Sequence, residues 1–157
     1  MHSLKATLSP VMGLLLTGCL LGDIFGSGRR GELDEHRRTW QESSVTDYSY
    51  RLERSCFCIN FGPADVSVVD GEIVSVFRLF DSTSVALSEF DIYETFDDLF
   101  ARVDAALRDE AHSVSVIYDE TYGFPSRIEI DYIKNAVDDE ITLSVSQFVP
   151  RSGDRIP

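Results

Sequence analysis

Two segments of the chain repeat apolar residues at helical spacing, and both predict amphipathic helices. In residues 32–43, Leu33, His36 and Trp40 fall on one face, because residues three, four and seven apart meet on the same side of an α-helix. The second segment follows Thr95, and its apolar stripe consists of Phe96, Leu99, Phe100, Val103 and Leu107. We expect Trp40 and this stripe to lie in the core, and His36 to be a packed histidine rather than a ligand.

The start of the second helix carries capping chemistry. Thr95 is a preferred N-cap residue, and Asp98 follows three positions later, as in a capping box. Asp97 and Asp98 also place negative charge at the positive end of the helix dipole. Paired carboxylates can serve acid–base catalysis, but capping accounts for these two more simply, so they are given no catalytic role.

Apolar and polar residues alternate elsewhere in the chain, which predicts β-strands. The strands are expected over residues 47–54, 56–61, 65–69, 72–80, 113–118, 127–132 and 141–146. Asp70-Gly71 separates two of them, and this pair favours the two-residue turn of a hairpin. In residues 56–61 the alternation directs Phe57 to the core and turns Cys56 and Cys58 to the opposite side.

The elements follow one another as helix, four strands, helix and three strands, with an irregular connection over residues 81–94. One side of each strand is apolar and the other polar, as in an antiparallel sheet with one solvated face. We therefore predict an α+β fold in which two helices pack on one face of an antiparallel sheet, as two related α–β units. Residues 32–149 form this single domain, and residues 150–157 form a frayed tail.

The amino-terminal segment has the pattern of an export signal. Lys5 gives it a positive start, and residues 11–16 are apolar except for Gly13. The apolar stretch is too short for a membrane-spanning helix, which needs about 20 residues, so residues 1–18 are interpreted as a signal peptide. The apolar run ends in Leu16-Thr17-Gly18-Cys19.

This last motif resembles the lipobox of bacterial lipoproteins. The resemblance implies cleavage before Cys19, diacylglycerol on its sulfur, and acylation of the new amine by a fatty acid such as palmitate. Leu20 is not an aspartate, which favours the outer membrane if the source has two membranes. Four glycines in residues 19–31 predict a flexible tether after the lipidated cysteine. The alternative is an ordinary secretory signal followed by a chance cysteine.

Composition and charge narrow the range of partners. The chain is 43 % hydrophobic and 26 % charged, as in globular proteins, and its formal charge is −13. Lys5 is the only Lys or Arg before Cys19, and no Asp or Glu precedes it, so the cleaved chain carries a formal charge of −14. Such a charge repels phosphates, and we expect no nucleic-acid partner.

Cys56 and Cys58 are the most informative pair for chemistry. With Cys19 lipidated, they form an even set of thiols in an oxidising compartment, where disulfides persist. On a strand their Cα atoms would lie ~6.6 Å apart, close to the upper limit of ~6.8 Å for a disulfide. We predict a disulfide between Cys56 and Cys58; a redox-active pair, metal ligation and unpaired thiols are the alternatives. A zinc site needs about four ligands, and His36 and His112 are single and distant in the sequence, so we assign no metal site.

The acidic run Asp138-Asp139-Glu140 offers oxygen ligands for calcium, together with Asp131 or the Asp119-Glu120 turn. It lacks the spacing of an EF-hand, and a solvated loop explains it more simply. The chain also lacks a nucleophile elbow, a phosphate-binding glycine loop and a zinc-protease motif. We therefore predict no enzymatic activity and no cofactor.

A set of short motifs occurs in an order that resembles one protein family. The motifs are Tyr48-Ser49-Tyr50, Ser55-Cys56-Phe57-Cys58, Asp70-Gly71, Thr95-Phe96-Asp97-Asp98-Leu99-Phe100, Tyr118-Asp119, Gly123-Phe124-Pro125-Ser126-Arg127-Ile128 and Asp138-Asp139-Glu140-Ile141. They resemble a family of uncharacterised bacterial lipoproteins with a domain of unknown function, over residues 35–148. The resemblance implies no site residues.

These observations together predict a membrane-anchored module that faces outside the cytoplasm. We expect a non-enzymatic binding or structural role in the cell envelope, with the membrane as one partner and an envelope protein or peptide as another. The alternative is a redox- or metal-responsive envelope protein that uses Cys56 and Cys58.

Overall fold

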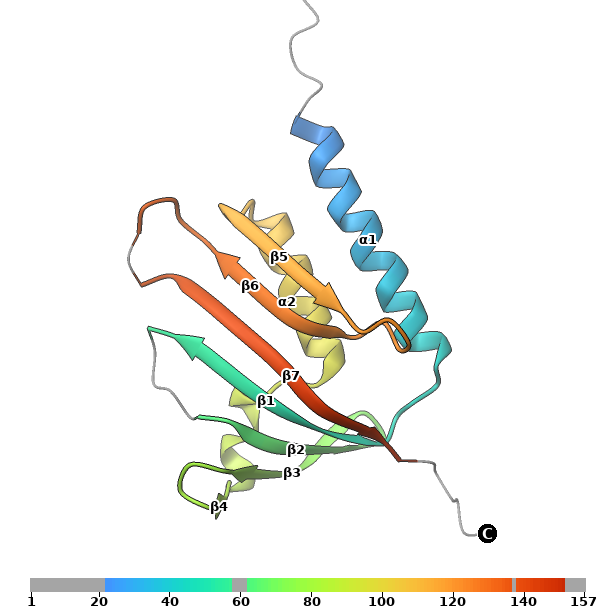
Figure 1. Cartoon of the computed structure of the whole chain (residues 1–157), viewed down its shortest axis with the longest axis vertical. Coiled ribbons are helices and arrows are strands. Elements are labelled where there is room, and N and C mark those ends of the chain that lie inside the picture. Colours follow the sequence, from blue (N-terminus) through green and yellow to red (C-terminus); the bar gives the residue numbers. More distant parts are fainter. Residues whose placement is uncertain (1–21, 58–61, 137, 152–157) are drawn as a thin grey trace, which may run out of the picture.

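Seven antiparallel strands form a single sheet in the computed structural model, which describes residues 22–57, 62–136 and 138–151. The strands run in the order β4-β3-β2-β1-β7-β6-β5, so β1 and β7 meet at the centre (Figure 1). Their bounds are Tyr48–Cys56 (β1), Ala64–Val69 (β2), Glu72–Arg78 (β3), Thr83–Ser84 (β4), Ser113–Tyr118 (β5), Pro125–Asp131 (β6) and Glu140–Pro150 (β7). The mixed α+β class and the antiparallel sheet are as predicted.

The predicted alternation of side chains is confirmed on the central strands. In β1, Tyr48, Tyr50 and Leu52 are buried, while the residues between them are half-buried or exposed. Tyr50 pairs with Val66 of β2, which is also buried. Directly opposite residues of an antiparallel pair share a face, so the apolar side of β1 continues into β2.

The Asp70-Gly71 turn joins β2 to β3 as predicted. Both residues have positive φ, at 51° and 79°, as a type I′ turn requires. The Asp47 carboxylate accepts a hydrogen bond from the Asp70 N–H at 2.9 Å and so supports the turn. The carbonyl of Asp47 accepts from the Arg151 N–H at 2.7 Å, just beyond the end of β7.

Helices α1 (Gly22–Glu42) and α2 (Phe96–Arg108) contact each other and supply aromatic side chains to the core. Trp40 of α1 is 4 % exposed and packs edge-on against Tyr48 and Phe96, with ring centroids 5.4 and 5.1 Å away. The Thr95 hydroxyl accepts from the Asp98 N–H, and the Asp98 carboxylate accepts from the Thr95 N–H. The core position of Trp40 and the capping box are therefore confirmed.

Gly123 lets α1 pack directly on the turn between β5 and β6. Its φ is +80°, and a Cβ atom there would lie 2.6 Å from the carbonyl oxygen of His36, which no side chain can tolerate. The His36 ring stacks on Tyr118 with 3.9 Å between centroids. This stack confirms that His36 is a packed histidine.

The helix α1 begins at Gly22, ten residues before the predicted start at residue 32. The predicted flexible tether over residues 19–31 is thus helical from Gly22 onward. Each glycine costs a helix about 1 kcal/mol relative to alanine, so the local sequence disfavours the extension. Local propensity therefore does not account for the helix at these positions; the Arg30 guanidinium, which donates to the Leu107 carbonyl at 3.4 Å, gives this segment a contact with α2. None of the described helices is both long and apolar enough to cross a membrane.

The prediction that Phe57 faces the core is wrong. The strand β1 runs without a break to Cys56, and the chain then bends at Phe57, which is 80 % exposed. Because side chains alternate with a period of two, a continuous strand puts Phe57 on the side of Glu53 and Ser55, opposite Leu52. Phe57 would face the core only if a new strand, with its own alternation of side chains, began at Cys56. The remaining residues of that predicted strand, 58–61, lie outside the described residues, and the seventh strand of the sheet is β4 at its edge.

Candidate functional site

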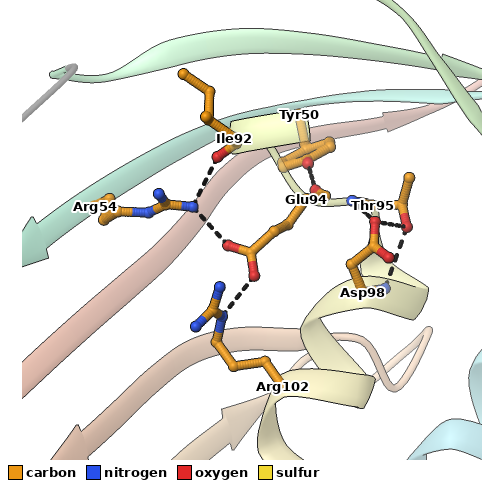
Figure 2. A network of polar contacts seen from close by, with 7 residues as sticks. All are labelled: Tyr50, Arg54, Ile92, Glu94, Thr95, Asp98 and Arg102. Atoms are coloured by element: carbon orange, nitrogen blue, oxygen red, sulfur yellow. Dashed lines mark hydrogen bonds and ion pairs between the residues drawn. The ribbon is translucent and has the colours of Figure 1, made fainter. Parts of the chain in front are cut away.

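A buried carboxylate links two arginines at the start of α2. Glu94 precedes the N-cap residue Thr95 and is 7 % exposed. One of its oxygens accepts from the Arg54 Nη2 at 2.8 Å, and the other accepts from the Arg102 Nε at 2.5 Å. Figure 2 shows the three side chains pointing toward one another from β1, the connection before α2, and α2 itself. We refer to Arg54, Glu94 and Arg102 as the charged cluster.

Backbone contacts fix the charged cluster in place. The Arg54 guanidinium also donates to the Ile92 carbonyl at 2.9 Å. The Tyr50 hydroxyl donates to the carbonyl of Glu94 (Figure 2). Burial raises the pKa of Tyr50 well above its ordinary value, so this hydroxyl keeps its proton at neutral pH. The connection before α2 is therefore tied to β1 on one side and capped onto α2 on the other.

Two opposing effects act on the pKa of Arg102 in the charged cluster. Burial lowers the pKa of Arg102, but the charge and hydrogen bond of Glu94 and a hydrogen bond with Tyr132 raise it, and the net shift is upward. Two guanidiniums around one carboxylate leave the cluster with one formal positive charge. Removing Glu94 from this arrangement leaves both guanidiniums without a counter-charge, which is costly.

A pocket of about 470 Å³ opens beside the charged cluster. It lies between the start of β3, the short 3₁₀ helix η1 (Leu87–Ile92) and the first turns of α2. The residues that line it are Glu72, Ile73, Phe90, Asp91, Tyr93, Glu94, Thr95, Asp98 and Arg102. Four of these are carboxylates, and Arg102 is the single cation among the described residues that line it. We call this concavity the acidic pocket.

The structure also brings together residues that the sequence had singled out separately. Cys56 at the end of β1 and Asp138 and Glu140 at the start of β7 line a second pocket of about 400 Å³, along with Phe57. The pairing of Cys56 with Ile141 accounts for this meeting. Cys19 and Cys58 lie outside the described residues, so lipidation and the disulfide stay predictions.

Two of the carboxylates considered for calcium, Asp119 and Asp139, have local roles in the loops. Asp119 accepts from the N–H groups of Thr121 and Tyr122 at 2.9 and 2.7 Å, and Asp139 accepts from the Ile133 N–H. Within the described ranges, no three His, Cys, Asp or Glu side chains are grouped so that they could hold a metal ion. His112 lies 4.0 Å from Asp131, far along the chain from His36.

The charged cluster could not be predicted from the sequence, for a physical reason. Glu94 belongs to the irregular connection over residues 81–94, where no periodicity marks a buried position. The position of Arg54 did indicate something unusual, because it lies on the same side of β1 as the buried Tyr50 and Leu52. A charged residue in a core register needs a buried partner, but the sequence does not say which carboxylate supplies it.

The protein is a small α+β domain in which the charged cluster connects strand β1 of the sheet to helix α2. The chain belongs to the family of unknown function DUF6174, whose model matches residues 32–150. Comparison with curated proteins gave no match, and comparison with solved structures gave none either.

Proposed function

We propose that this protein is a lipid-anchored binding module of the cell envelope whose acidic pocket takes a cationic segment of a protein partner. The observation that carries the proposal is the acidic pocket itself, with Glu72, Asp91, Glu94 and Asp98 around one concavity. A cleft lined by one sign of charge concentrates ligands of the opposite sign. The formal charge of −13 on the whole chain acts in the same direction.

The anchor in this proposal is lipid on Cys19. Its support is the Leu16-Thr17-Gly18-Cys19 motif and the apolar run before it, which is too short to span a bilayer. The proposal places the protein outside the cytoplasm, on the outer membrane where the source has two. It also takes the two helices to cover one face of the sheet as parts of two α–β units, which leaves the polar face solvated.

A binding role fits the chemistry of the acidic pocket better than catalysis does. The Glu94 carboxylate is engaged by two guanidiniums at 2.8 and 2.5 Å, so it is poorly placed to accept a proton from a substrate. Asp98 is engaged in the capping box of α2. The exposed Glu72 and Asp91 are the carboxylates best placed to meet a ligand cation.

Binding of a fluorescent oligolysine peptide, followed by anisotropy, tests the acidic pocket. Replacing both Glu72→Gln and Asp91→Asn should weaken binding roughly tenfold, since each ion pair near a surface contributes about 0.7 kcal/mol. A matched control removes two exposed carboxylates elsewhere, Glu53→Gln and Glu120→Gln. Equal weakening by both double variants, or by neither, would overturn the assignment of the pocket. Photo-crosslinking from position 91 in native membranes would then identify the partner.

A second candidate function is redox chemistry at Cys56 and Cys58. The favouring observation is that β1 ends at Cys56 and the chain bends at Phe57. A chain that bends between two cysteines would bring their Cα atoms closer than the ~6.6 Å of a straight strand, as a disulfide requires. A disulfide that closes so small a ring removes little conformational entropy from the unfolded chain. Replacing both cysteines by serine should therefore lower the free energy of unfolding by at most ~2 kcal/mol.

Peptide mapping without reductant decides whether the disulfide forms. Alkylation of both cysteines in the freshly isolated protein would contradict it and favour metal ligation. A disulfide with a very low reduction potential would be structural only. A potential close to those of thiol oxidants outside the cytoplasm would raise redox activity above binding.

A further inference from the structure

The loop between β6 and β7 exposes apolar side chains at one end of the domain. Ile133 is 62 % exposed and Tyr132 is 37 % exposed, and Lys134 beside them is exposed as well. The Asp139 carboxylate accepts from the Ile133 N–H, which holds the loop in shape. Exposed apolar side chains that lie together can form part of a surface that contacts a membrane or a partner.

Hydrogen bonds connect this loop indirectly, through the start of β5 and the end of α2, to the amino-terminal half of α1. The Tyr132 carbonyl accepts from the His112 N–H at 3.2 Å, at the start of β5. The Arg30 guanidinium of α1 reaches the Leu107 carbonyl near the end of α2, a few residues before His112. Along the long axis of the molecule, Figure 1 shows the β6–β7 loop toward the end where α1 begins, and β4 toward the opposite end.

The proposed lipid site is close to that same end. Cys19 precedes Gly22, the first residue of α1, by three positions. Three extended residues span at most about 11 Å. Since α1 continues as one helix into the packed segment around Leu33 and Trp40, the anchor fixes which end of the domain faces the bilayer.

We infer that the β6–β7 loop, through Tyr132, Ile133 and Lys134, rests on the lipid surface beside the anchor. This inference depends on the proposed lipidation of Cys19. Its chemistry suits an interface: tyrosine places its ring among headgroups, isoleucine buries apolar surface, and lysine extends its amine toward water and phosphate. The exposed Arg29 and Arg30 add positive charge at the same end. The acidic pocket, which lies between η1 and the start of α2, then points away from the bilayer.

Lys134 provides a direct readout, because it is the only lysine after Cys19. An amine-reactive reagent should label Lys134 several-fold more slowly in the lipidated protein on phosphatidylcholine vesicles than in the soluble Cys19→Ala chain. Mass spectrometry of the peptide that contains Lys134 separates this signal from the terminal amine. The control variant is Leu87→Lys, at a position 78 % exposed in η1, whose added amine should react at the same rate in both forms.

The outcomes separate this inference from the lipidation on which it rests. If the lipidated chain sediments with the vesicles but Lys134 reacts as fast as in the soluble chain, the loop does not meet the bilayer and the anchor stands. If the chain with its native Cys19 stays in the supernatant, lipidation fails and the inference fails with it. Equal slowing of Lys134 and of the amine added at position 87 would show general shielding and overturn the orientation.

Discussion

Glu94 joins three parts of the chain through one carboxylate, which makes it the residue where a single change in charge should matter most. Replacing Glu94→Gln keeps the shape of the side chain but leaves the guanidiniums of Arg54 and Arg102 without a counter-charge. The side chain of Arg54 is 19 % exposed and that of Arg102 is 31 % exposed, so water screens part of the penalty. We expect the free energy of unfolding to fall by about 3 kcal/mol.

Urea denaturation measures this loss. The control is Glu129→Gln, which breaks the Arg127–Glu129 pair on the surface, where both side chains are 46 % exposed. That variant should lose less than about 1 kcal/mol. Equal effects of the two substitutions would show that the charged cluster stabilises no more than a surface ion pair.

Tyr118 predicts a specific response to alkaline pH. Burial raises the pKa of its hydroxyl above the ordinary value, nearby Glu32 raises it further, and Arg37 opposes the shift. The folded state thus holds this proton more tightly than the unfolded state does. Its contribution to stability is full below about pH 10 and is lost as the pH rises further.

Stability measured at about pH 9 and about pH 11 should therefore fall less in Tyr118→Phe than in the parent protein. The comparison uses the difference between the two pH values, so any cost of the substitution itself cancels. An equal loss of stability at alkaline pH in both proteins would show that the Tyr118 hydroxyl ionises as readily in the folded state as in the unfolded state.

At the scale of elements, α2 and the alternation along the strands were predictable, because both follow from the spacing of apolar residues over a few positions. The capping box at Thr95 and the Asp70-Gly71 turn were predictable too, since both depend on residues a few positions apart. The start of α1 and the side on which Phe57 lies were not. The helix α1 continues into glycine-rich sequence that local propensity disfavours, and the unbroken strand β1 decides on which side of the sheet Phe57 lies. The charged cluster needs pairing between distant segments, which periodicity does not encode.

The stripe on α2 gives the sharpest test of packing between elements. Phe100 is 1 % exposed, and the Arg37 guanidinium of α1 lies 5.6 Å from the centre of its ring. Replacing Phe100→Ala should lower the free energy of unfolding by ~3–5 kcal/mol, because the emptied volume cannot be refilled. Arg108→Ala, at the exposed end of the same helix, should change it by no more than about 0.5 kcal/mol. A denaturant midpoint for Phe100→Ala equal to that of the parent would refute the burial of the α2 stripe in the core.

The whole molecule has two unlike ends in the proposed arrangement. One end carries the start of α1 and the β6–β7 loop with its exposed Ile133. The acidic pocket forms between η1, the start of β3 and the first turns of α2, on another part of the domain. A partner with cationic residues could then reach the pocket while the lipid holds the opposite end. The orientation follows from a helix that begins three residues after Cys19.

The proposed anchor depends on one atom, the sulfur of Cys19. Cys19→Ala removes the acceptor for lipid, and none of the described helices could replace it as a membrane span. We expect the variant to leave the membrane pellet, because the remaining loop contacts bury too little apolar surface for stable attachment. Fractionation after a high-salt wash measures this, and Cys56→Ser serves as the control that removes a different thiol and should stay in the pellet. A Cys19→Ala chain that sediments as fully as the parent would refute the lipoprotein interpretation, whatever the acidic pocket binds.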